Sequence, residues 1–473
     1  MTSTSRWLVA ALAACACPAL LAAPADAWRS SYQPAAHPPT LIRGATALLG
    51  NGERLEQADI LLVDGRIERI GSGLSAPAGA IEIDGRGKWV TPGLIDVHSH
   101  LGVYPSPGMQ AHSDGNEMTS SATPQVWAEH AVWPQDPGFH TALAGGVTAM
   151  QILPGSGNLI GGRGVTLKNV PAVTYQEMKF PDAPQGLKMA CGENPKRFYG
   201  GRGQAPMTRM GNVAGYRAAF QEASEYRRTL QRHAQRQRDG ESQPRRRGRS
   251  EAPAVGGGGP LDTPKRDLRL ETLVGVLDGE ILLHVHCYRA DEMAVMLDLA
   301  REFEFQIAAF HHGVEAYKLA DTLAREGVCG ALWADWWGFK MEAYDAINEN
   351  IALVDRPEGG CAIVHSDSSE GIQRLNQEAA KVMAHAAEAG IDIPPERAIT
   401  WLTRNAARSL GIESRTGTLE AGKMADVVLW DRNPFSVYAK ADQVFVDGVL
   451  LYDRADPRRQ PLSDFMLGQE GAR

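Results

Sequence analysis

The chain has 473 residues, of which 43% are hydrophobic and 22% are charged, and its formal net charge is −8 at pH 7. This length is enough for two or three domains, or for one barrel with a smaller module. The balance of apolar and charged residues is ordinary for a soluble globular protein. The negative charge argues against nucleic acid as the main partner.

The first 27 residues have the pattern of an export signal. Arg6 supplies a positive charge, Trp7 to Ala23 is apolar, and Ala25-Asp26-Ala27 offers small residues before a cleavage site. We therefore expect a periplasmic or secreted protein that is cleaved near Ala27. A lipoprotein anchored through Cys15 is the alternative, because Leu12-Ala13-Ala14-Cys15 resembles a lipobox. No later run reaches about 18 apolar residues, so we expect no transmembrane segment in the mature chain.

Such a cleavage leaves Cys191, Cys287, Cys329 and Cys361. An exported protein could pair these cysteines, but each lies in or beside a candidate barrel strand, and their spacing shows no disulfide framework. We therefore predict small buried thiols rather than disulfides or metal ligands.

The two ends of the chain share a pattern of short strands. Residues 46–70 contain strand-like runs with Asp64-Gly65 as a hairpin turn, and residues 425–452 contain similar runs around Asp447-Gly448. We expect one small β-sandwich module that is assembled from residues 28–92 and 411–473.

Between these ends, strand-like and helix-like segments alternate, which predicts an α/β fold with a (β/α)8 TIM-like barrel over residues 93–410. Helical periodicity is clear in Asp291–Glu302, Ala316–Arg325 and Leu375–Ala389. The candidate strands are Leu94–Val97, Val147–Leu153, Gly186–Ala190, Ile281–Val285, Phe305–Phe310, Gly330–Trp333 and Ala362–His365.

Residues 204–266 interrupt this alternation. They contain a helix-like segment, Tyr216–Arg238, followed by Arg245-Arg246-Arg247-Gly248-Arg249 and a glycine run at 256–259. Binding of RNA or another polyanion is one interpretation of the arginine run. A solvated loop is the favoured one, because Gly, Pro, Ser and Gln are interspersed.

Histidines and an aspartate follow several candidate strands. His98 and His100 end the first strand, and their i, i+2 spacing places both imidazoles on one face. Because the carboxyl ends of barrel strands meet at one face, we expect these side chains to form a single metal site. A carboxylate there can bind the metal and accept the proton of an attacking water. The later members of the set are His284, His286, His311, His312 and Asp367.

Two motifs resemble those of the amidohydrolase superfamily. Pro92-Gly93-Leu94-Ile95-Asp96-Val97-His98-Ser99-His100 matches the opening motif of that superfamily. Asn405-Ala406-Ala407, followed by Gly417–Asp426, matches the closing motif. The chain is most similar to the imidazolonepropionase-like branch, and there to a group with a Gly192-Glu193-Asn194-Pro195-Lys196 segment and a helical insertion after it. The resemblance covers nearly all of the expected mature chain. It implies a class of reaction but does not identify the substrate.

The resemblance implies a role for each strand-end residue. His98, His100, His284 and His312 match metal ligands of the superfamily. Asp367 matches the residue that binds the metal and acts as the general base, and His312 would assist catalysis.

The resemblance leaves other roles open. His286 would face the substrate, and Arg289 could hold a substrate carboxylate, although pairing with a surface acid explains Arg289 equally well. The ligand that bridges two metals is either Lys188, which corresponds to a carboxylated lysine in several relatives, or Glu193. We favour Lys188 slightly; a plain lysine would repel two cations, so it would have to be carboxylated or neutral.

The expected function is hydrolysis of a C–N bond in a peptide, an N-acyl amino acid or a cyclic amide by water activated at one or two divalent ions, with zinc as the expected metal. A mononuclear deaminase of a heterocyclic amine is one alternative and would need no bridging residue. A catalytically inactive binding scaffold is another. We expect a small-molecule substrate and no nucleic acid as partner, and a homo-oligomer is compatible with the sequence.

Overall fold

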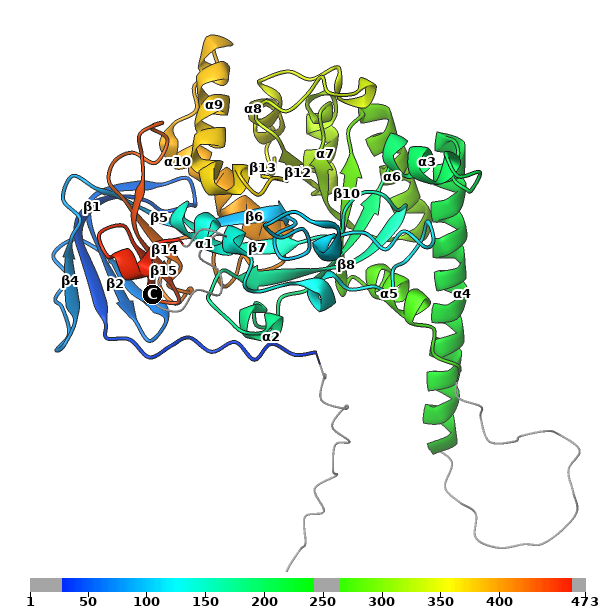
Figure 1. Cartoon of the computed structure of the whole chain (residues 1–473), viewed down its shortest axis with the longest axis horizontal. Helices are drawn as coiled ribbons and strands as arrows, with labels where there is room; N and C mark the ends of the chain where they lie inside the picture. Colours follow the sequence, from blue (N-terminus) through cyan, green and yellow to red (C-terminus); the bar gives the residue numbers. More distant parts are fainter. Residues whose placement is uncertain (1–27, 242–263, 462–473) are drawn as a thin grey trace, which may run out of the picture.

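A computed structural model of the chain describes residues 28–241 and 264–461 (Figure 1). The expected export signal and the arginine run at 245–249 lie outside these residues. Two eight-stranded sheets organise the described part: one forms the barrel, and the other is assembled from both ends of the chain. Within the described ranges, no helix is both long enough and apolar enough to span a membrane.

The barrel sheet has the strand order β13-β12-β11-β10-β9-β8-β7-β6. Almost every residue in these strands is buried, because one face lines the barrel and the other is covered by helices. The strands are β6 (Leu94–Ser99), β7 (Val147–Ile152), β8 (Ile160–Lys168), β9 (Gln185–Ala190), β10 (Ile281–Cys287), β11 (Ile307–His312), β12 (Cys329–Leu332) and β13 (Ala362–Val364).

Strand β8 departs from the parallel barrel that the sequence predicted. It pairs antiparallel with both β7 and β9, whereas the other neighbouring strands of this sheet pair in parallel. No strand was predicted over these residues, and the structure requires a glycine at Gly162. Gly162 has a φ of +117°, and a Cβ at this position would lie 2.6 Å from the carbonyl oxygen of Val126. The missing side chain therefore lets a neighbouring segment pass beside the strand.

The barrel closes between β13 and β6, which are the two ends of the hydrogen-bonded path. The Ser366 hydroxyl donates to a carboxylate oxygen of Asp96, and the Ser366 amide donates to the Asp96 carboxylate over 3.2 Å. The amide of Asp367 donates to the carbonyl oxygen of His98 over 3.0 Å. This seam holds two of the predicted site residues beside each other.

Helices cover the outside of the barrel. α5 begins after Asp267, whose carboxylate accepts from the amides of Arg269 and Leu270 and so caps the helix. The helices are α1 (Pro137–Ala144), α2 (Tyr175–Met178), α3 (Glu193–Gly200), α4 (Arg209–Glu241), α5 (Leu268–Leu277), α6 (Ala290–Phe303), α7 (Ala320–Glu326), α8 (Asn350–Asp355), α9 (Leu375–Glu388), α10 (Pro395–Ala398) and α11 (Arg404–Ser409).

The insertion contains a helix longer than the predicted Tyr216–Arg238. The first half of α4 packs on the barrel side, where Tyr216, Phe220 and Ala223 are buried. The Phe220 ring lies 4.5 Å from the Phe305 ring between centroids. The second half projects beyond the barrel (Figure 1), and its side chains from 224 to 239 are exposed or half-buried.

The second sheet joins both ends of the chain through the antiparallel pair β5–β14. Its strands follow one hydrogen-bonded path, β16-β15-β14-β5-β1-β2-β3, with β4 beside β1. Buried side chains from both ends of the chain, among them Ile60 and Val427, belong to one apolar core. Hairpin turns with positive φ occur at Asp64-Gly65 and Asp447-Gly448, as predicted. The strands are β1 (Thr40–Leu48), β2 (Arg54–Val63), β3 (Arg66–Gly71), β4 (Ile81–Asp84), β5 (Trp89–Pro92), β14 (Val427–Trp430), β15 (Ala441–Val446) and β16 (Val449–Asp453).

A buried ionic cluster links the barrel to the second sheet. Lys168, at the end of β8, places its ammonium 2.9 Å from a carboxylate oxygen of Asp426 and 2.9 Å from one of Asp447. The Tyr32 hydroxyl donates to Asp447 over 2.6 Å, and the Thr416 hydroxyl donates to Asp426 over 2.8 Å. We call these five residues the junction cluster.

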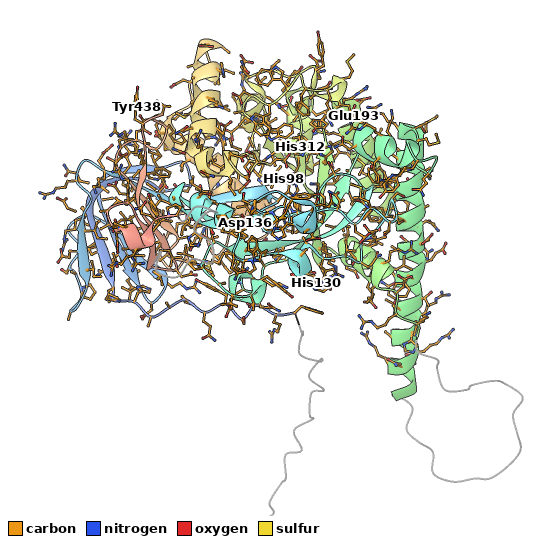
Figure 2. The ribbon with its side chains drawn as sticks, in the orientation of Figure 1. His98, His130, Asp136, Glu193, His312 and Tyr438 are labelled. Atoms are coloured by element: carbon orange, nitrogen blue, oxygen red, sulfur yellow. A yellow bond between two sulfur atoms is a disulfide. The ribbon has the colours of Figure 1, made fainter. Side chains whose placement is uncertain are left out.

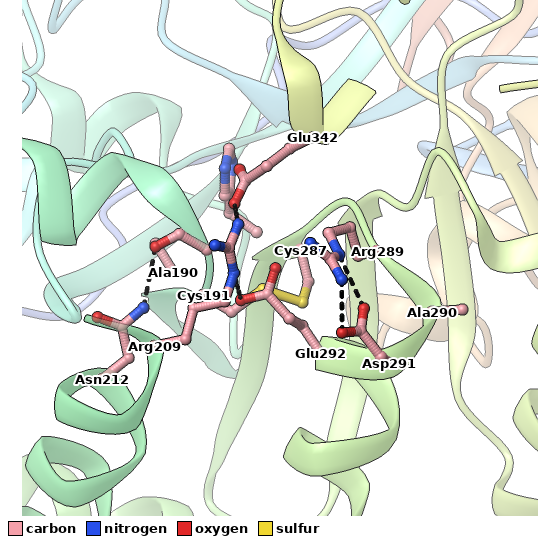
Figure 3. Close-up of a disulfide and its surroundings, with 12 residues drawn as sticks. Ala190, Cys191, Arg209, Asn212, Cys287, Arg289, Ala290, Asp291, Glu292 and Glu342 are labelled. Atoms are coloured by element: carbon pink, nitrogen blue, oxygen red, sulfur yellow. Dashed lines mark hydrogen bonds and ion pairs between the residues drawn. A yellow bond between two sulfur atoms is a disulfide. The ribbon is translucent and has the colours of Figure 1, made fainter. Parts of the chain in front are cut away.

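The prediction of free thiols is wrong, because the cysteines form the disulfides Cys191–Cys287 and Cys329–Cys361. Strand register explains both pairs. Ala190 lies opposite His286 in the β9–β10 pair, so the next residue of each strand is a cysteine facing its neighbour (Figure 3). In the β12–β13 pair, Gly330 lies opposite Ala362, and the preceding residues are the other two cysteines.

Candidate metal centre

Histidine side chains from β6, β10, β11 and the end of β13 gather at the carboxyl ends of the barrel strands. Figure 2 shows two of them, His98 and His312, close to the middle of the barrel. Parallel pairing sets Lys188 opposite His284 and His286 opposite His311. Side chains in register on neighbouring strands point to the same side, so these pairs share a face of the sheet. We call the set the histidine centre; its members are His98, His100, Lys188, His284, His286, His311, His312, His365 and Asp367.

Asp367 joins the two histidines of the opening motif. One of its carboxylate oxygens lies 3.1 Å from Nε2 of His100 and 3.4 Å from Nε2 of His98. The other ring nitrogen of His100 lies 2.8 Å from the carbonyl oxygen of Leu153, which orients the imidazole. The side chains of Asp367 and His100 are 23% and 20% exposed, whereas that of His98 is 1% exposed. The centre therefore opens to solvent at Asp367 and His100.

A chain of hydrogen-bonded rings runs below this opening. His311 uses both ring nitrogens: Nδ1 lies 2.9 Å from Nδ1 of His98, and Nε2 lies 2.9 Å from Nδ1 of His284. The second nitrogen of His284 lies 3.3 Å from the side-chain amide of Gln151. Both ring nitrogens of His311 and His284 thus lie within hydrogen-bonding distance of other side chains. The structure brings His284, a predicted metal ligand, into the histidine centre through this chain of rings.

His312 and His365 offer the free nitrogens instead. Nδ1 of each ring is buried and has no hydrogen-bond partner in the described part of the chain. The potential ligand atoms of His98, His312 and His365 all lie within 4.8 Å of one another, as do those of His98, His100 and Asp367. The two groups overlap at His98. His365 is the last residue of a predicted strand and was not among the predicted ligands, although its position two residues before Asp367 is a signal for this role.

The backbone is constrained at two residues of the histidine centre. His312 has a φ of 71° and Asp367 a φ of 49°, both in the left-handed region that costs a non-glycine residue about 1–2 kcal/mol. Such conformations concentrate at functional sites, because the surrounding structure has to hold them.

Burial keeps the histidines neutral. Desolvation lowers the pKa of His98, His286, His311 and His312 well below the ordinary value, and the charge of Lys188 lowers it further. Burial likewise lowers the pKa of His284 and His365 to about 3. A neutral imidazole keeps a lone pair on one nitrogen, which is the form that binds a metal ion.

Asp367 carries the negative charge of the centre. Burial alone would raise the pKa of its carboxyl group, but the hydrogen bond from His100 and the positive charge of Lys188 hold that pKa below the ordinary value. The carboxylate is therefore ionised near neutral pH and is available as a ligand or a proton acceptor.

Of the two candidate bridging residues, Lys188 lies in the centre. Its Nζ is 3.2 Å from Nε2 of His98 and 3.2 Å from the carbonyl oxygen of Pro154, and burial lowers its pKa to about 8. Glu193 begins α3, and its carboxylate lies 3.7 Å from Nζ of Lys340. The structure thus brings Lys188 to the histidines and pairs Glu193 with a loop lysine.

The two predicted substrate-binding residues are placed differently. His286 belongs to the centre: its Nε2 lies 3.3 Å from the side-chain amide of Asn194, and its Nδ1 has no hydrogen-bond partner among the described residues. Arg289 uses its guanidinium fork on the neighbouring Asp291, over 2.9 Å and 2.8 Å (Figure 3). That pairing with a surface acid is the alternative that the sequence analysis left open for Arg289.

The donor set fits a divalent cation. It combines neutral imidazoles with a carboxylate, which is the ligand chemistry of catalytic zinc sites and of other divalent metals. His286, His312 and His365 each have a buried ring nitrogen without a hydrogen-bond partner in the described ranges, and a bound ion or substrate would satisfy these atoms.

Comparison with known proteins shows which family the chain belongs to. Residues 363–452 match a model described as the amidohydrolase family. The crystal structure of an amidohydrolase from Thermotoga maritima is 32% identical to the chain with a TM-score of 0.76, covering 88% of this chain and all of that one.

The chain is also similar in sequence to two curated proteins. The chain is 33% identical over 447 residues to amidohydrolase tasK of Hapsidospora irregularis, which covers 88% of this chain but only 43% of that longer protein. It is 26% identical over 407 residues to an imidazolonepropionase of Mesorhizobium japonicum, covering 80% of this chain and 87% of that one. The chain belongs to the amidohydrolase superfamily and, within it, to the imidazolonepropionase-like branch.

Proposed function

We propose that the chain is a metal-dependent hydrolase of C–N bonds. The observation that carries this proposal is the contact between Asp367 and the histidines at the open end of the barrel. An ionised carboxylate lies 3.1 Å from His100 and 3.4 Å from His98, next to ring nitrogens that have no hydrogen-bond partner among the described residues. Buried polar atoms without hydrogen-bond partners do not stabilise a folded core, so this set of atoms is explained by the binding of an ion or a substrate.

Each side chain has a separable task. His98 and His100, with His312 and His365, would hold one or two divalent ions. When bound, such an ion supplies Lewis acidity and lowers the pKa of water towards about 7. Asp367 faces the same opening and is ionised, so it can accept the proton of the attacking water and return it to the leaving nitrogen.

Lys188 supports a site for two ions. Its lowered pKa makes the neutral amine accessible, and a neutral amine can react with carbon dioxide to form a carbamate with ligand oxygens. The mononuclear deaminase remains the second candidate function, because the potential ligand atoms of His98, His100 and Asp367 lie within 4.8 Å of one another and are enough to hold a single ion. An inactive scaffold would not need an ionised carboxylate at the open end.

We also propose that the protein works outside the cytoplasm, with zinc as the expected metal and a peptide, an N-acyl amino acid or a cyclic amide as the substrate. Two disulfides support the location, since such bonds persist in oxidising compartments. The substrate classes follow from the C–N chemistry of the proposed reaction.

The test is a panel of these three substrate classes, with heterocyclic amines as a fourth, assayed on the mature chain after loading with zinc, manganese or cobalt. We expect release of an amine or a ring-opened acid that stops with a chelator and returns with metal. Release of ammonia from the heterocyclic amines alone would favour the deaminase. No turnover in any class with any of the metals would contradict the proposal.

A further inference from the structure

The loop after β12, residues 333–349, carries large apolar side chains at the surface. Trp336 is 42% exposed, Phe339 is 60% exposed and Tyr344 is 74% exposed. Soluble proteins rarely cluster such side chains in contact with water unless the surface binds something. The contacts of these side chains indicate what kind of molecule binds to the loop.

The rings of this loop form a series that starts at the histidine centre. Trp333 stacks on His312, with ring centroids 4.2 Å apart and the planes at 30°. Trp336 and Phe339 follow at 5.7 Å and 6.0 Å from Trp333. Tyr288, the residue after β10, has its ring centroid 5.4 Å from that of His312 and 6.3 Å from that of Phe339. We call Tyr288, Trp333, Trp336 and Phe339 the aromatic wall.

The exposed fraction of the side chains increases along the wall, from the rings beside the histidine centre to the outer rings. Tyr288 is 4% exposed and Trp333 is 9% exposed, whereas the outer rings face solvent. A molecule lying on the outer rings would therefore have its inner end beside His312, in the centre that holds Asp367. Continuity with the centre argues for a substrate rather than a separate partner.

Polar contacts hold the wall in place before anything binds. Nζ of Lys340 lies 4.2 Å above the Tyr288 ring and 5.8 Å from the Phe339 ring, and it donates to Asn194 over 2.9 Å. The indole nitrogen of Trp333 donates to the carbonyl oxygen of Ser366 over 3.3 Å. A surface fixed in this way loses little conformational entropy when a ligand settles on it.

We propose that the aromatic wall is a subsite for a flat apolar group, an aromatic ring above all, attached close to the scissile C–N bond. Aromatic faces favour offset stacking and edge contacts with other rings, which the outer members of the wall leave available. The wall thus selects, among the proposed substrates, N-acyl amino acids or peptides with an aromatic group over small polar cyclic amides. This inference rests on the proposed function and narrows its substrate class.

Two matched pairs of probes test the wall. N-benzoylglycine with N-acetylglycine places the ring on the acyl side, and N-acetyl-L-phenylalanine with N-acetyl-L-alanine places it on the amine side. We expect the metal-loaded enzyme to prefer the aromatic member of at least one pair by about tenfold in kcat/KM, which corresponds to about 1.4 kcal/mol.

The variants Trp336→Ala and Phe339→Ala should each reduce that preference by about two- to tenfold, mainly through KM. Tyr344→Ala is the matched control, because it removes an exposed ring from the same loop outside the wall, and it should leave the preference unchanged. Equal rates for both members of both pairs, or a preference that survives both wall variants, would overturn the inference.

Calorimetric titration separates this inference from the proposed chemistry. The metal-loaded Asp367→Asn protein should bind the aromatic probe of the preferred pair more tightly than its methyl partner, and Trp336→Ala in that background should remove the difference. This result with no hydrolysis by the wild type would retain the wall and reject the chemistry. Hydrolysis without preference, or no binding of any probe, would reject the wall. A wall variant that changes only the oligomeric state would also reject it, because the rings would then be an interface between copies.

Discussion

The junction cluster and the histidine centre are both buried and polar, but they are built in opposite ways. In the junction cluster, one ammonium lies between two carboxylates, and two hydroxyls donate to the same carboxylates. Charges of opposite sign are paired at hydrogen-bonding distance, which is the condition for a buried ionic group to be tolerated in a fold.

The histidine centre instead crowds imidazoles against each other and against Lys188. Burial makes the rings neutral, and three of them keep a nitrogen without a protein partner in the described part of the chain. The junction cluster is complete as it stands, whereas the histidine centre needs a ligand to satisfy its atoms. Stability therefore explains the first cluster, and function explains the second.

The largest expected effect is loss of activity without loss of fold. Asp367→Asn keeps the shape and the hydrogen bond to His100 but removes the proton acceptor, so kcat should fall by about 10²- to 10⁴-fold. Steady-state kinetics on the best substrate measures this change, and thermal unfolding should show a nearly unchanged Tm. Asp298→Asn on the outside of α6 is the control. An Asp367→Asn enzyme with normal turnover would remove Asp367 from its proposed role.

The junction cluster should show the reverse behaviour. Lys168→Met leaves Asp426 and Asp447 buried without their cation, so the free energy of unfolding should fall by about 3–5 kcal/mol. Chemical denaturation measures the loss. Lys381→Met is the control, because Lys381 forms half-exposed ion pairs with Asp335 and Glu378, and such pairs contribute about 0–1 kcal/mol. Equal losses in the two variants would mean that the junction cluster adds no special stability.

The disulfides should also affect stability more than chemistry. Replacing both cysteines of one pair by serine should cost about 2–4 kcal/mol. The Cys191–Cys287 bond spans 96 residues and the Cys329–Cys361 bond 32, so the chain-entropy argument predicts the larger loss for the first pair. Denaturation of the two double variants measures the difference. Loss of bound metal in a variant that stays folded would mean that the bond also shapes the histidine centre.

A smaller effect should distinguish Lys188 from Glu193. Lys188→Ala should lose the second metal ion of a bridged site, while Glu193→Ala should keep it, because Glu193 pairs with Lys340 instead of the histidines. Elemental analysis of both variants provides the comparison. Equal metal content in the two proteins would show that neither residue bridges.

Hydrophobic pattern and turn chemistry predicted much of the fold. Apolar runs between helical segments located the barrel strands other than β8, and Asp-Gly pairs located both hairpin turns. Strand β8 escaped prediction because Gly161, Gly162 and Gly164 break its apolar pattern. The disulfides could not be predicted, because the spacing of cysteines along the sequence does not show which strands pair or in which register. The cysteine pairs depend on which residues of neighbouring strands lie opposite each other, and only the folded structure shows this.

The sequence predicted which strand ends carry the site residues, but it did not predict how their side chains are arranged in space. The sequence placed His98, His100 and Asp367 at strand ends, and the structure brings them into contact. The resemblance implied the metal-binding role for His312 and not for the adjacent His311. In the described part of the chain, Nδ1 of His312 has no hydrogen-bond partner, whereas both ring nitrogens of His311 have one. The free nitrogen of His365 is a similar case, because only the folded arrangement shows which rings already have partners.

The most direct measurement is the metal content of the chain from residue 28 onwards, compared with the variants His98→Ala and His385→Ala. His98 belongs to both potential ligand groups, while His385 lies on α9 beside Glu388 and serves as the control. We expect one or two equivalents in the wild-type protein and in His385→Ala, and a clear loss in His98→Ala. No bound metal in the wild type after incubation with zinc, manganese or cobalt would contradict the metal centre and the function built on it.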